Sequence, residues 1–490
     1  MNDRSVKGRI RRGEQAALGD VSPEDFRQQL HEIADWIADY REKIEELPVA
    51  PSAKPGTIAA QLPKEPPEEG ESFDQIFADF KRVIFPGVLQ WGHPQFAAYF
   101  GSTTTAPGIE GEILSGALNI NAMTWRTSPA ATELETVVLD WLRQWLGLSD
   151  KFGGVLYDTA SVGLMHALAV AREEAVSCAR KQGLAGRADV PRLRIYASDQ
   201  GHSSVDKAAI ALGIGADNVR RVPSDSNFRM DVAQLREMIA QDRQQNFRPI
   251  AVMASVGTTS TASVDPIPEI AKICREEKMW LHIDGAYGAG LALLPECNWI
   301  TAGWGEADSI VINPHKMLFV PFDFSVLYVR DVERLRRVFT LVPEYLRGDT
   351  VEAEKNYMDY TIQLGRRFRA IKAWMVFRTF GRAGIAARIR EHLRIAHSLA
   401  DWIKTDDRFE LAAPVVMPVV CFRFVAAPED NLDTLNSEIV ERVNASGRAY
   451  VTQTKLHGRT VIRIGLGNVL TTEQHLRNVW NLIQSAADSL

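Results

Sequence analysis

The sequence predicts an α/β protein: a mostly parallel sheet covered by helices, with an N-terminal helical arm and a small C-terminal α+β unit. Between about residues 100 and 380, short apolar segments alternate with helical stretches. The apolar segments are continuous, which is typical of strands that are buried on both faces. Alternation of this kind indicates β-α-β units, in which helices cover a parallel sheet.

The N-terminal part has a different pattern. Apolar side chains recur at helical spacing over residues 24–47, and six prolines between residues 48 and 67 then predict an extended arm. A second helix is expected from Ser72, with Gln75 three residues later completing a capping box. Neither helix has an evident local core to cover, so we expect both to pack on another domain or another subunit.

The central strands and the C-terminal unit follow from the same patterns. The expected strands of the large sheet are residues 153–157, 193–198, 250–256, 279–283 and 309–312, with helices at 162–176 and 266–278 among them. The C-terminal unit is expected to contain a helix at about 383–404, strands at 419–425 and 460–466, and a helix at 471–487.

Composition excludes several classes of protein. The formal net charge is −6, and no basic patch indicates a nucleic-acid partner. The four cysteines are scattered without metal-ligand spacing, so no metal is expected. The N-terminus lacks the apolar core of a secretory signal, and no apolar run approaches a membrane span. We therefore expect a cytoplasmic protein with reduced cysteines and no membrane partner.

Polar residues follow the predicted strands, at the sheet edge where such proteins bind ligands. Ala160 and Ser161 begin a helix after strand 153–157, which indicates helix capping or, alternatively, an anion site. His202 follows strand 193–198 and by itself is an ordinary loop histidine. A hydroxyl-rich loop, "GTTSTASVDP", follows strand 250–256.

A carboxylate and a lysine follow the last two strands. Asp284 lies between an apolar strand and small residues, so it is expected to have a cationic partner. Lys316, in "NPHKM" (313–317), ends a core strand, where a cation is costly to bury. The two interpretations of Lys316 are a solvated loop lysine and a nucleophilic amine.

One cofactor needs all of these groups at one sheet edge. Pyridoxal phosphate has an aldehyde for a lysine amine, a pyridine nitrogen that a carboxylate keeps protonated, a flat ring for an imidazole and a phosphate for an anion site. The sequence therefore predicts a pyridoxal-phosphate site.

The chain also resembles the group II pyridoxal-phosphate decarboxylases, most of all the aromatic-L-amino-acid decarboxylases, from about Asp25 to the final helix. Met317 departs from the family pattern, which commonly has tryptophan after the lysine. The motifs that carry the resemblance are "HPQFAAYF" (93–100), "SPAATELETVVLDWL" (128–142), "SDQGHSSVDKA" (198–208), "HIDGAYG" (282–288), "NPHKM" (313–317) and "QLGRRFRAIKAW" (363–374).

The resemblance implies a fold-type I homodimer with active sites at the subunit interface. From the resemblance and the sequence patterns together, we expect the chain to divide into four parts. They are a disordered tail (1–24), a helical and extended dimerisation arm (25–100), a large cofactor-binding α/β domain (101–382) and a small α+β domain (383–490).

The resemblance also implies a role for each candidate residue. Lys316 would be the Schiff-base lysine, Asp284 would pair with the pyridine nitrogen, and His202 would stack on the ring. The other expected cofactor residues are Ala160, Ser161, Asn313 and His315 at the phosphate, Thr259 beside the cofactor, and Ala286, whose small side chain lets the ring lie close.

Tyr345, in "LVPEYLRGD" (341–349), is an ordinary loop tyrosine when taken alone. The resemblance implies a catalytic proton donor that reaches the neighbouring subunit's site. In this family a phenylalanine at that position goes with aldehyde synthases, which divert decarboxylation to oxidative deamination. Tyr345 thus favours plain decarboxylation, and an aldehyde synthase is the alternative. A non-catalytic cofactor-binding protein is a further alternative, against which the complete set of catalytic residues argues.

The expected substrate is an aromatic L-amino acid of the tryptophan, DOPA, tyrosine or phenylalanine type, and a non-aromatic one is the less favoured alternative. Four aromatic side chains, Trp91, Tyr99, Phe100 and Phe322, are candidates for the pocket wall, although core packing accounts for at least one of them. The resemblance implies that Gly365 leaves room for an indole or catechol ring. No arginine clamp for an acidic substrate is evident in these motifs.

Overall fold

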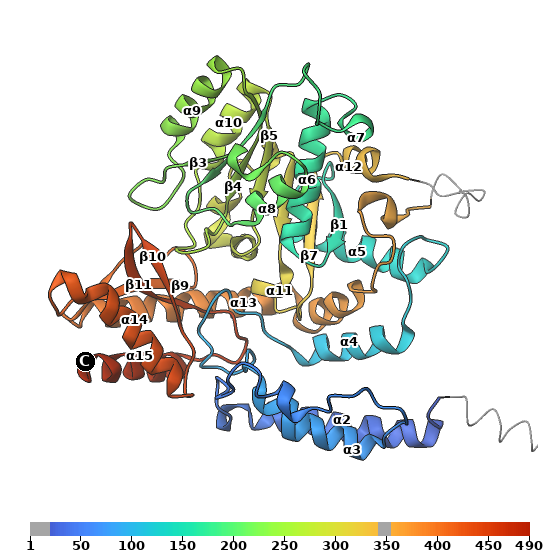
Figure 1. The fold of residues 1–490 in the computed structure, drawn as a ribbon, viewed down its shortest axis with the longest axis vertical. Helices are drawn as coiled ribbons and strands as arrows, with labels where there is room; N and C mark the ends of the chain where they lie inside the picture. The colour runs from blue at the N-terminus through green and yellow to red at the C-terminus, as the bar shows by residue number, and fades with distance from the viewer. Residues whose placement is uncertain (1–19, 342–353) are drawn as a thin grey trace, which may run out of the picture. The chain divides into compact units, whose positions relative to one another are not determined.

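The computed structural model describes residues 20–341 and 354–490, and the chain forms two compact units divided between His93 and Pro94. The first unit contains α2 (Pro23–Glu42) and α3 (Phe73–Asp79), which continues as a π-helical turn, Phe80–Ile84 (Figure 1). Short 3₁₀ turns complete it: Ile44–Glu46, Ala59–Gln61 and Phe85–Gly87. The expected capping box is present. The Ser72 hydroxyl accepts a hydrogen bond from the Gln75 backbone N–H, and the Gln75 side chain accepts one from the Ser72 backbone N–H.

Aromatic rings pack the two helices of this unit together. The Trp36 ring of α2 lies edge-on to Phe80 at 5.0 Å and to Phe85 at 5.2 Å between centroids. These ring contacts join the two helices, but neither helix has a buried residue, so the expectation that both pack on another domain or another subunit stays a prediction. Phe26 and Ile76 stay exposed.

The second unit contains a seven-stranded sheet in the order β1-β7-β6-β5-β4-β2-β3. The strands are β1 (Gly153–Tyr157), β2 (Leu193–Ser198), β3 (Val219–Val222), β4 (Arg248–Ser255), β5 (Trp280–Asp284), β6 (Ser309–Ile312) and β7 (Ser325–Val329). Strands β2 to β6 run parallel, whereas β7 is antiparallel to both β6 and β1. The predicted mostly parallel sheet is confirmed, with one reversed strand that the sequence patterns did not indicate.

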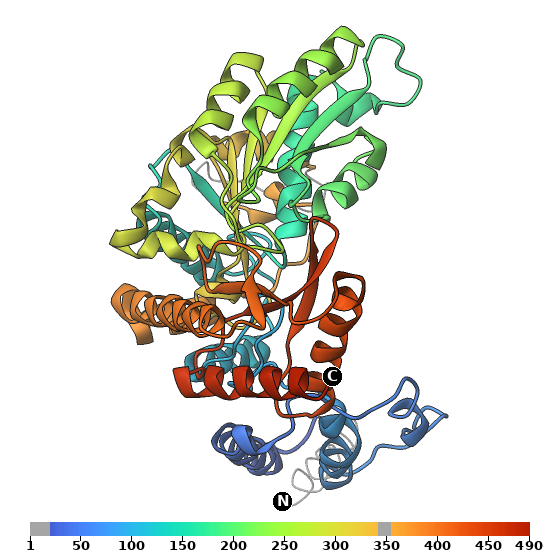
Figure 2. The ribbon, with the colours of Figure 1, turned by 90° about the vertical axis from the view of Figure 1, so that its left-hand side faces the viewer.

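Helices lie on both faces of this sheet (Figures 1 and 2). Helix α6 packs across β4 to β7, and α9 and α10 pack on β4. The helices up to the C-terminal part are α4 (Ala106–Leu118), α5 (Pro129–Trp145), α6 (Ala160–Ala175), α7 (Ala179–Gln182), α8 (Ser204–Ala211), α9 (Val232–Gln244), α10 (Ile267–Glu277), α11 (Pro314–Met317), α12 (Val332–Phe339) and α13 (Ala370–Lys404). The parallel strands between these helices end at a common edge, where short loops carry polar residues.

A second, antiparallel sheet of four strands forms the C-terminal part, in the order β10-β11-β9-β8. Its strands are β8 (Phe409–Leu411), β9 (Val419–Phe424), β10 (Thr452–Leu456) and β11 (Arg459–Gly465), and its helices are α14 (Glu429–Ala445) and α15 (Glu473–Asp488). It has its own buried apolar cluster, in which the Trp480 ring meets Phe409 at 5.0 Å. The predicted small α+β unit is thus confirmed in outline.

Helix α13 begins earlier than the expected residue 383. Its backbone is interrupted at Gly381, which has φ of 60° and ψ of 170°, a conformation that glycine adopts without a Cβ clash. Buried side chains such as Ala373 and Phe377 continue the helix before that point. Within residues 20–341 and 354–490, no helix combines the length and apolar character needed to cross a membrane.

Candidate active site

A cavity of about 370 Å³ opens at the carboxyl ends of the parallel strands. This volume lies in the range of about 300–1,000 Å³ that is typical of small-molecule sites. All nine residues that the sequence places around a cofactor line it: Ala160, Ser161, His202, Thr259, Asp284, Ala286, Asn313, His315 and Lys316. Tyr99 and Phe100 line it as well.

Lys316 lies on the one-turn helix α11, directly after β6. Its Nζ is 4.9 Å from the centroid of the Phe100 ring, and it forms no ion pair with any carboxylate of the described residues. Burial lowers the pKa of the Lys316 amine, and the nearby Arg463 lowers it further, while Asp284 acts in the opposite direction. The amine therefore gives up its proton more easily than an exposed lysine, as a nucleophile must.

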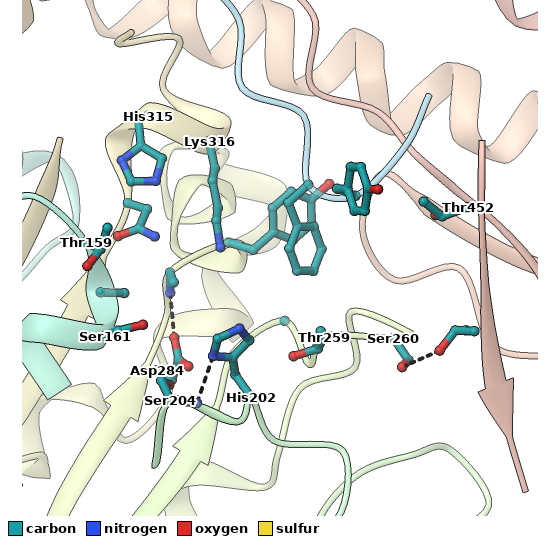
Figure 3. Close-up of a pocket in the computed structure, with 18 of the residues that line it drawn as sticks. Thr159, Ser161, His202, Ser204, Thr259, Ser260, Asp284, His315, Lys316 and Thr452 are labelled. Carbon is teal, nitrogen blue, oxygen red and sulfur yellow. Dashed lines mark hydrogen bonds between the residues drawn. The ribbon is translucent and has the colours of Figure 1, made fainter. Parts of the chain in front are cut away.

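Asp284 is the last residue of β5, and its carboxylate points into the same space as Lys316 (Figure 3). It accepts a hydrogen bond from the Ala286 backbone N–H at 3.1 Å. Among the described residues it has no ion-pair partner, although it is half-buried at the wall of the cavity. A cation on a bound molecule is the partner that this arrangement calls for.

His202 lies beside Asp284 (Figure 3). Its Nδ1 accepts the backbone N–H of Ser204 at 3.1 Å, so in the neutral ring the proton is on Nε2. Partial burial lowers the pKa of the His202 imidazole, Asp284 acts in the opposite direction, and Lys316 lowers the pKa further. The imidazole is thus neutral near pH 7 and offers a flat face to the cavity.

Hydrogen-bond donors gather on the other side of Lys316. Helix α6 begins there after its N-cap residue, Thr159, so its first N–H groups have no partner within the helix. Figure 3 shows Thr159, Ser161 and His315 on this side. His315 Nδ1 accepts from the Phe324 N–H at 3.0 Å, and burial lowers the His315 pKa to about 3, so its Nε2 carries a proton as a donor.

Asn313, which also lines this side, has a buried Oδ1 atom with no partner among the described atoms. Rotation of the amide by half a turn presents two N–H donors at the same place. A multiply charged anion such as a phosphate would fit here. The groups that would bind it are the N-terminus of α6, the hydroxyls of Thr159 and Ser161, the His315 imidazole and the Asn313 amide.

The cavity also has residues that the sequence analysis did not select. Among them are Tyr287, which stacks on Phe100 at 4.0 Å, and Ser260, whose hydroxyl bonds Thr454 at 2.9 Å. Arg463 lines the cavity from β11. Its only sequence signal is a charge inside an otherwise apolar strand, 460–466, which was assigned to the C-terminal unit without a function.

Three predicted residues lie elsewhere, and a fourth falls outside the described residues. Phe322 is 64% exposed, with its ring 4.8 Å from that of His315, and it does not line the cavity. Gly365 is exposed, and a Cβ added there would meet only Asn121 Nδ2, at 3.8 Å. Trp91 belongs to the first unit, where it is 40% exposed. Tyr345 lies outside the described residues.

Residues 20–341 and 354–490 contain no group of three or more histidine, cysteine, aspartate or glutamate side chains that could hold a metal ion.

Comparison with known proteins identifies relatives along nearly the whole chain. The family model described as "Pyridoxal-dependent decarboxylase conserved domain" matches residues 55–425. Tryptophan decarboxylase 1 of Oryza sativa subsp. japonica is 36% identical over 499 residues, covering 98% of this chain and 96% of that relative. Phenylacetaldehyde synthase of Arabidopsis thaliana is 35% identical over 490 residues, covering 98% of this chain and 99% of that relative.

The fold agrees with this relationship. A crystal structure of Oryza sativa TDC with PLP and tryptamine has a TM-score of 0.92 to this chain at 36% identity, and covers 96% of this chain and 99% of that one. This agreement confirms the fold-type I architecture. The chain belongs to the group II pyridoxal-phosphate-dependent decarboxylases, in the aromatic amino acid decarboxylase subfamily, and pyridoxal 5'-phosphate is its cofactor.

Proposed function

We propose that this enzyme decarboxylates an aromatic L-amino acid to the corresponding arylalkylamine and CO₂. The observation that carries the proposal is an unpaired lysine amine and an unpaired carboxylate in one cavity, between a flat imidazole and an anion site. When bound, the cofactor supplies an electron sink for the pair of electrons left when CO₂ departs.

The residues present fit that cofactor, and each has a task that its surroundings support. The Lys316 amine would hold the cofactor covalently. Asp284, which lacks a protein cation, would pair with the pyridine nitrogen and keep it protonated. His202 would cover one face of the ring, and the small side chain of Ala286 would leave space beside it. Thr259 would lie next to the ring.

The anion site would hold the phosphate. Ser161 and Ala160 would contribute the start of α6, and His315 and Asn313 would donate from the turn after β6. The unpartnered Oδ1 position of Asn313 supports this assignment, because flipping the amide would put its NH2 group there and let it donate to a phosphate oxygen.

The aromatic substrate class is supported by the relatives and by the cavity wall. Tyr99 and Phe100 both line the cavity, and Tyr99 is 47% exposed, which leaves its ring available to a substrate. CO₂ release should be measured with tryptophan, 5-hydroxytryptophan, DOPA, tyrosine, phenylalanine and glutamate. We expect the highest kcat/KM with an aromatic substrate; a higher value for glutamate than for every aromatic one would overturn the substrate class.

An aldehyde synthase is the second candidate, since the relatives include a phenylacetaldehyde synthase. The two functions differ in the fate of the substrate α-carbon, which is protonated in the first and oxidised in the second. Tyr345 supports the first, because a phenol can supply the proton that a phenylalanine lacks. Quantifying amine against aldehyde, ammonia and peroxide from one reaction separates the two functions.

We also propose that two chains assemble into a homodimer whose interface completes each site. Three neighbouring segments carry exposed apolar side chains: Ile113, Leu114 and Leu118 on α4, Phe322 after β6, and Ile362 and Leu364 before α13. A Cβ on Gly108 would touch Pro321, and the Ser115 hydroxyl donates to the Phe368 carbonyl, so these segments are adjacent. We infer that a second copy of the chain covers this apolar surface with the same surface of its own.

The interface proposal has a direct test in mixed dimers of Lys316→Ala and Tyr345→Phe. If Tyr345 acts on the partner's site, one site of the mixed dimer carries both defects and the other carries none. Activity recovered on mixing supports the shared site. No recovery, with subunit exchange verified, contradicts it.

A further inference from the structure

Arg463 is a buried cation without a counter-ion. The residue is 5% exposed, and no carboxylate of the described residues forms an ion pair with it. Other buried arginines of this unit are paired: Arg366 with Glu135, and Arg423 with Glu429 and Asp433. Because an unpaired buried charge is costly, we expect the Arg463 guanidinium to have a function beside the cavity.

The guanidinium of Arg463 joins three segments of the cavity wall. It donates to the backbone carbonyls of Tyr99 at 2.6 Å, Ser260 at 2.9 Å and Thr259 at 3.1 Å. Each of these residues lines the cavity, and the segments that carry them are far apart along the chain. Arg463 therefore holds three parts of the cavity wall together: its own strand β11, the loop after β4 and the turn at Tyr99.

Arg463 also lies close to the proposed cofactor lysine. Its Cζ is 4.7 Å from the centroid of the Phe100 ring, and Lys316 Nζ is 4.9 Å from the same centroid, so the two charges are at most about 10 Å apart. The Phe100 ring, which stacks on Tyr287 at 4.0 Å, contacts both cations. A fixed positive charge at this distance disfavours a second one on the lysine.

We propose that Arg463 is a positioning residue that clamps the cavity wall and, through its charge, favours the unprotonated form of the Lys316 amine for attack on the cofactor aldehyde. In that step the nitrogen bonds to the aldehyde carbon, and its two protons leave with the carbonyl oxygen as water, so no oxidant or reductant is needed. The inference rests on the proposed role of Lys316. Burial is the largest cause of the lowered pKa of the Lys316 amine; Asp284 acts against it, and the charge of Arg463 opposes Asp284 by lowering the pKa.

The test follows the capture of pyridoxal phosphate by the cofactor-free full-length protein, using the absorbance of the bound cofactor between pH 6 and 11. Only the unprotonated amine attacks, so the midpoint of the rate against pH reports the Lys316 pKa. Arg463→Gln keeps an amide donor for the carbonyls but removes the charge. Two unit charges about 10 Å apart at an effective dielectric constant of about 20 shift a pKa by about one unit, so the midpoint should rise by about one pH unit.

Two matched variants separate charge from packing. Arg463→Lys keeps the charge and should leave the midpoint near that of the wild type, although fewer carbonyls are satisfied. Arg423→Gln alters a buried arginine of the same sheet that has carboxylate partners, and should not move the midpoint. A shift in Arg423→Gln equal to that in Arg463→Gln, or no shift in Arg463→Gln, overturns the proposal.

The proposal can also be tested without the Arg463→Gln variant. If Arg463→Gln does not fold, as judged by near-ultraviolet circular dichroism, a wild-type midpoint at or above the ordinary lysine value of about 10.4 overturns it. So does a one-unit rise in Arg463→Lys. If instead the proposed role of Lys316 is wrong, the cofactor would be found on a lysine other than Lys316 in the wild-type protein.

Discussion

Lys316 and Lys372 are two lysines largely withdrawn from water in the same unit, and burial lowers the pKa of both amines. Lys372, on α13, is 1% exposed and is held by Glu112, with Asp323 at 3.8 Å. Lys316 faces a cavity, has no carboxylate within ion-pair distance, and has a second cation nearby. Lys372 is the more deeply buried of the two, and it is also the one with carboxylate partners.

This contrast shows why burial alone does not mark a reactive lysine. A buried ammonium paired with carboxylates keeps its proton and serves packing and charge balance between helices. A buried amine without a counter-ion, next to a cavity and to a cation, loses its proton more readily and becomes a nucleophile. The Lys316 and Lys372 variants test the two sides of this contrast directly, and the other variants test the site around Lys316.

The largest effect is expected for Lys316→Ala. Removal of the amine should abolish decarboxylation, because no other described amine lines the cavity. CO₂ release under saturating cofactor is the measurement, and Lys372→Met is the matched control, which should keep the turnover number per folded molecule. Turnover retained in Lys316→Ala would reverse the assignment of the two lysines.

Asp284→Asn removes the carboxylate nearest to the proposed pyridine nitrogen at nearly constant volume. The turnover number should fall by about 10²-fold or more, which is the cost of losing one stabiliser of transition-state charge. Asp242→Asn is the control, since Asp242 is a buried carboxylate that pairs with Tyr196 and with arginines away from the cavity. It should lower the melting temperature without changing the turnover number. A near-normal turnover number in Asp284→Asn with cofactor bound would rule out the proposed role.

Tyr345→Phe changes the fate of the product more than the binding of the substrate. With the phenol absent, the amine yield should drop, and aldehyde, ammonia and peroxide should appear if oxygen reaches the substrate carbon before a proton does. Chromatography of products together with a peroxide assay measures this partition. Amine formed at the wild-type rate would mean that another group donates the proton.

Lys372→Met should act on stability alone. Removing the lysine leaves Glu112 with Arg367 and Asp323 with Arg369 as their remaining partners, and the lost charged hydrogen bond is expected to cost about 1–3 kcal/mol in the free energy of unfolding. Urea unfolding followed by circular dichroism measures this cost. An unchanged unfolding midpoint would show that the Lys372 pairs contribute nothing net.

The smallest effect is expected for Gly365→Ser. In a single chain the added side chain has free space, because the nearest contact of a Cβ is Asn121 Nδ2 at 3.8 Å. A loss of kcat/KM for indolic substrates relative to tyrosine therefore requires that Gly365 face the partner's site. Equal kcat/KM ratios in the variant and the wild type would remove Gly365 from the specificity determinants.

The sequence predicted the parts of the fold that depend on continuous apolar runs. The segments 153–157, 193–198 and 309–312 match β1, β2 and β6 to the residue, because runs buried on both faces leave no ambiguity. The edge strand β3 was missed, since "VRRV" is polar at its centre. The local packing of α2 on α3 was also missed, because ring contacts such as Trp36 with Phe80 depend on how the arm turns back.

The cavity shows a similar division. Residues that directly follow a strand, such as Asp284 and Lys316, were placed by the rule for strand ends. Arg463 was not, because it lies inside a strand of the second sheet, and only the three-dimensional fold brings it beside Phe100. The same limit applies to Phe322, whose sequence neighbours His315 and Lys316 line a cavity that Phe322 itself does not. Spacing along the chain cannot report such long-range contacts.

The most direct test of the contrast between the two lysines is borohydride reduction of the cofactor-loaded protein, followed by proteolysis and mass spectrometry of the labelled peptide. Our account predicts a single pyridoxyl label on Lys316, in the peptide that contains "NPHKM", with Lys372 unlabelled. A label on Lys372, or on any lysine other than Lys316, would contradict it.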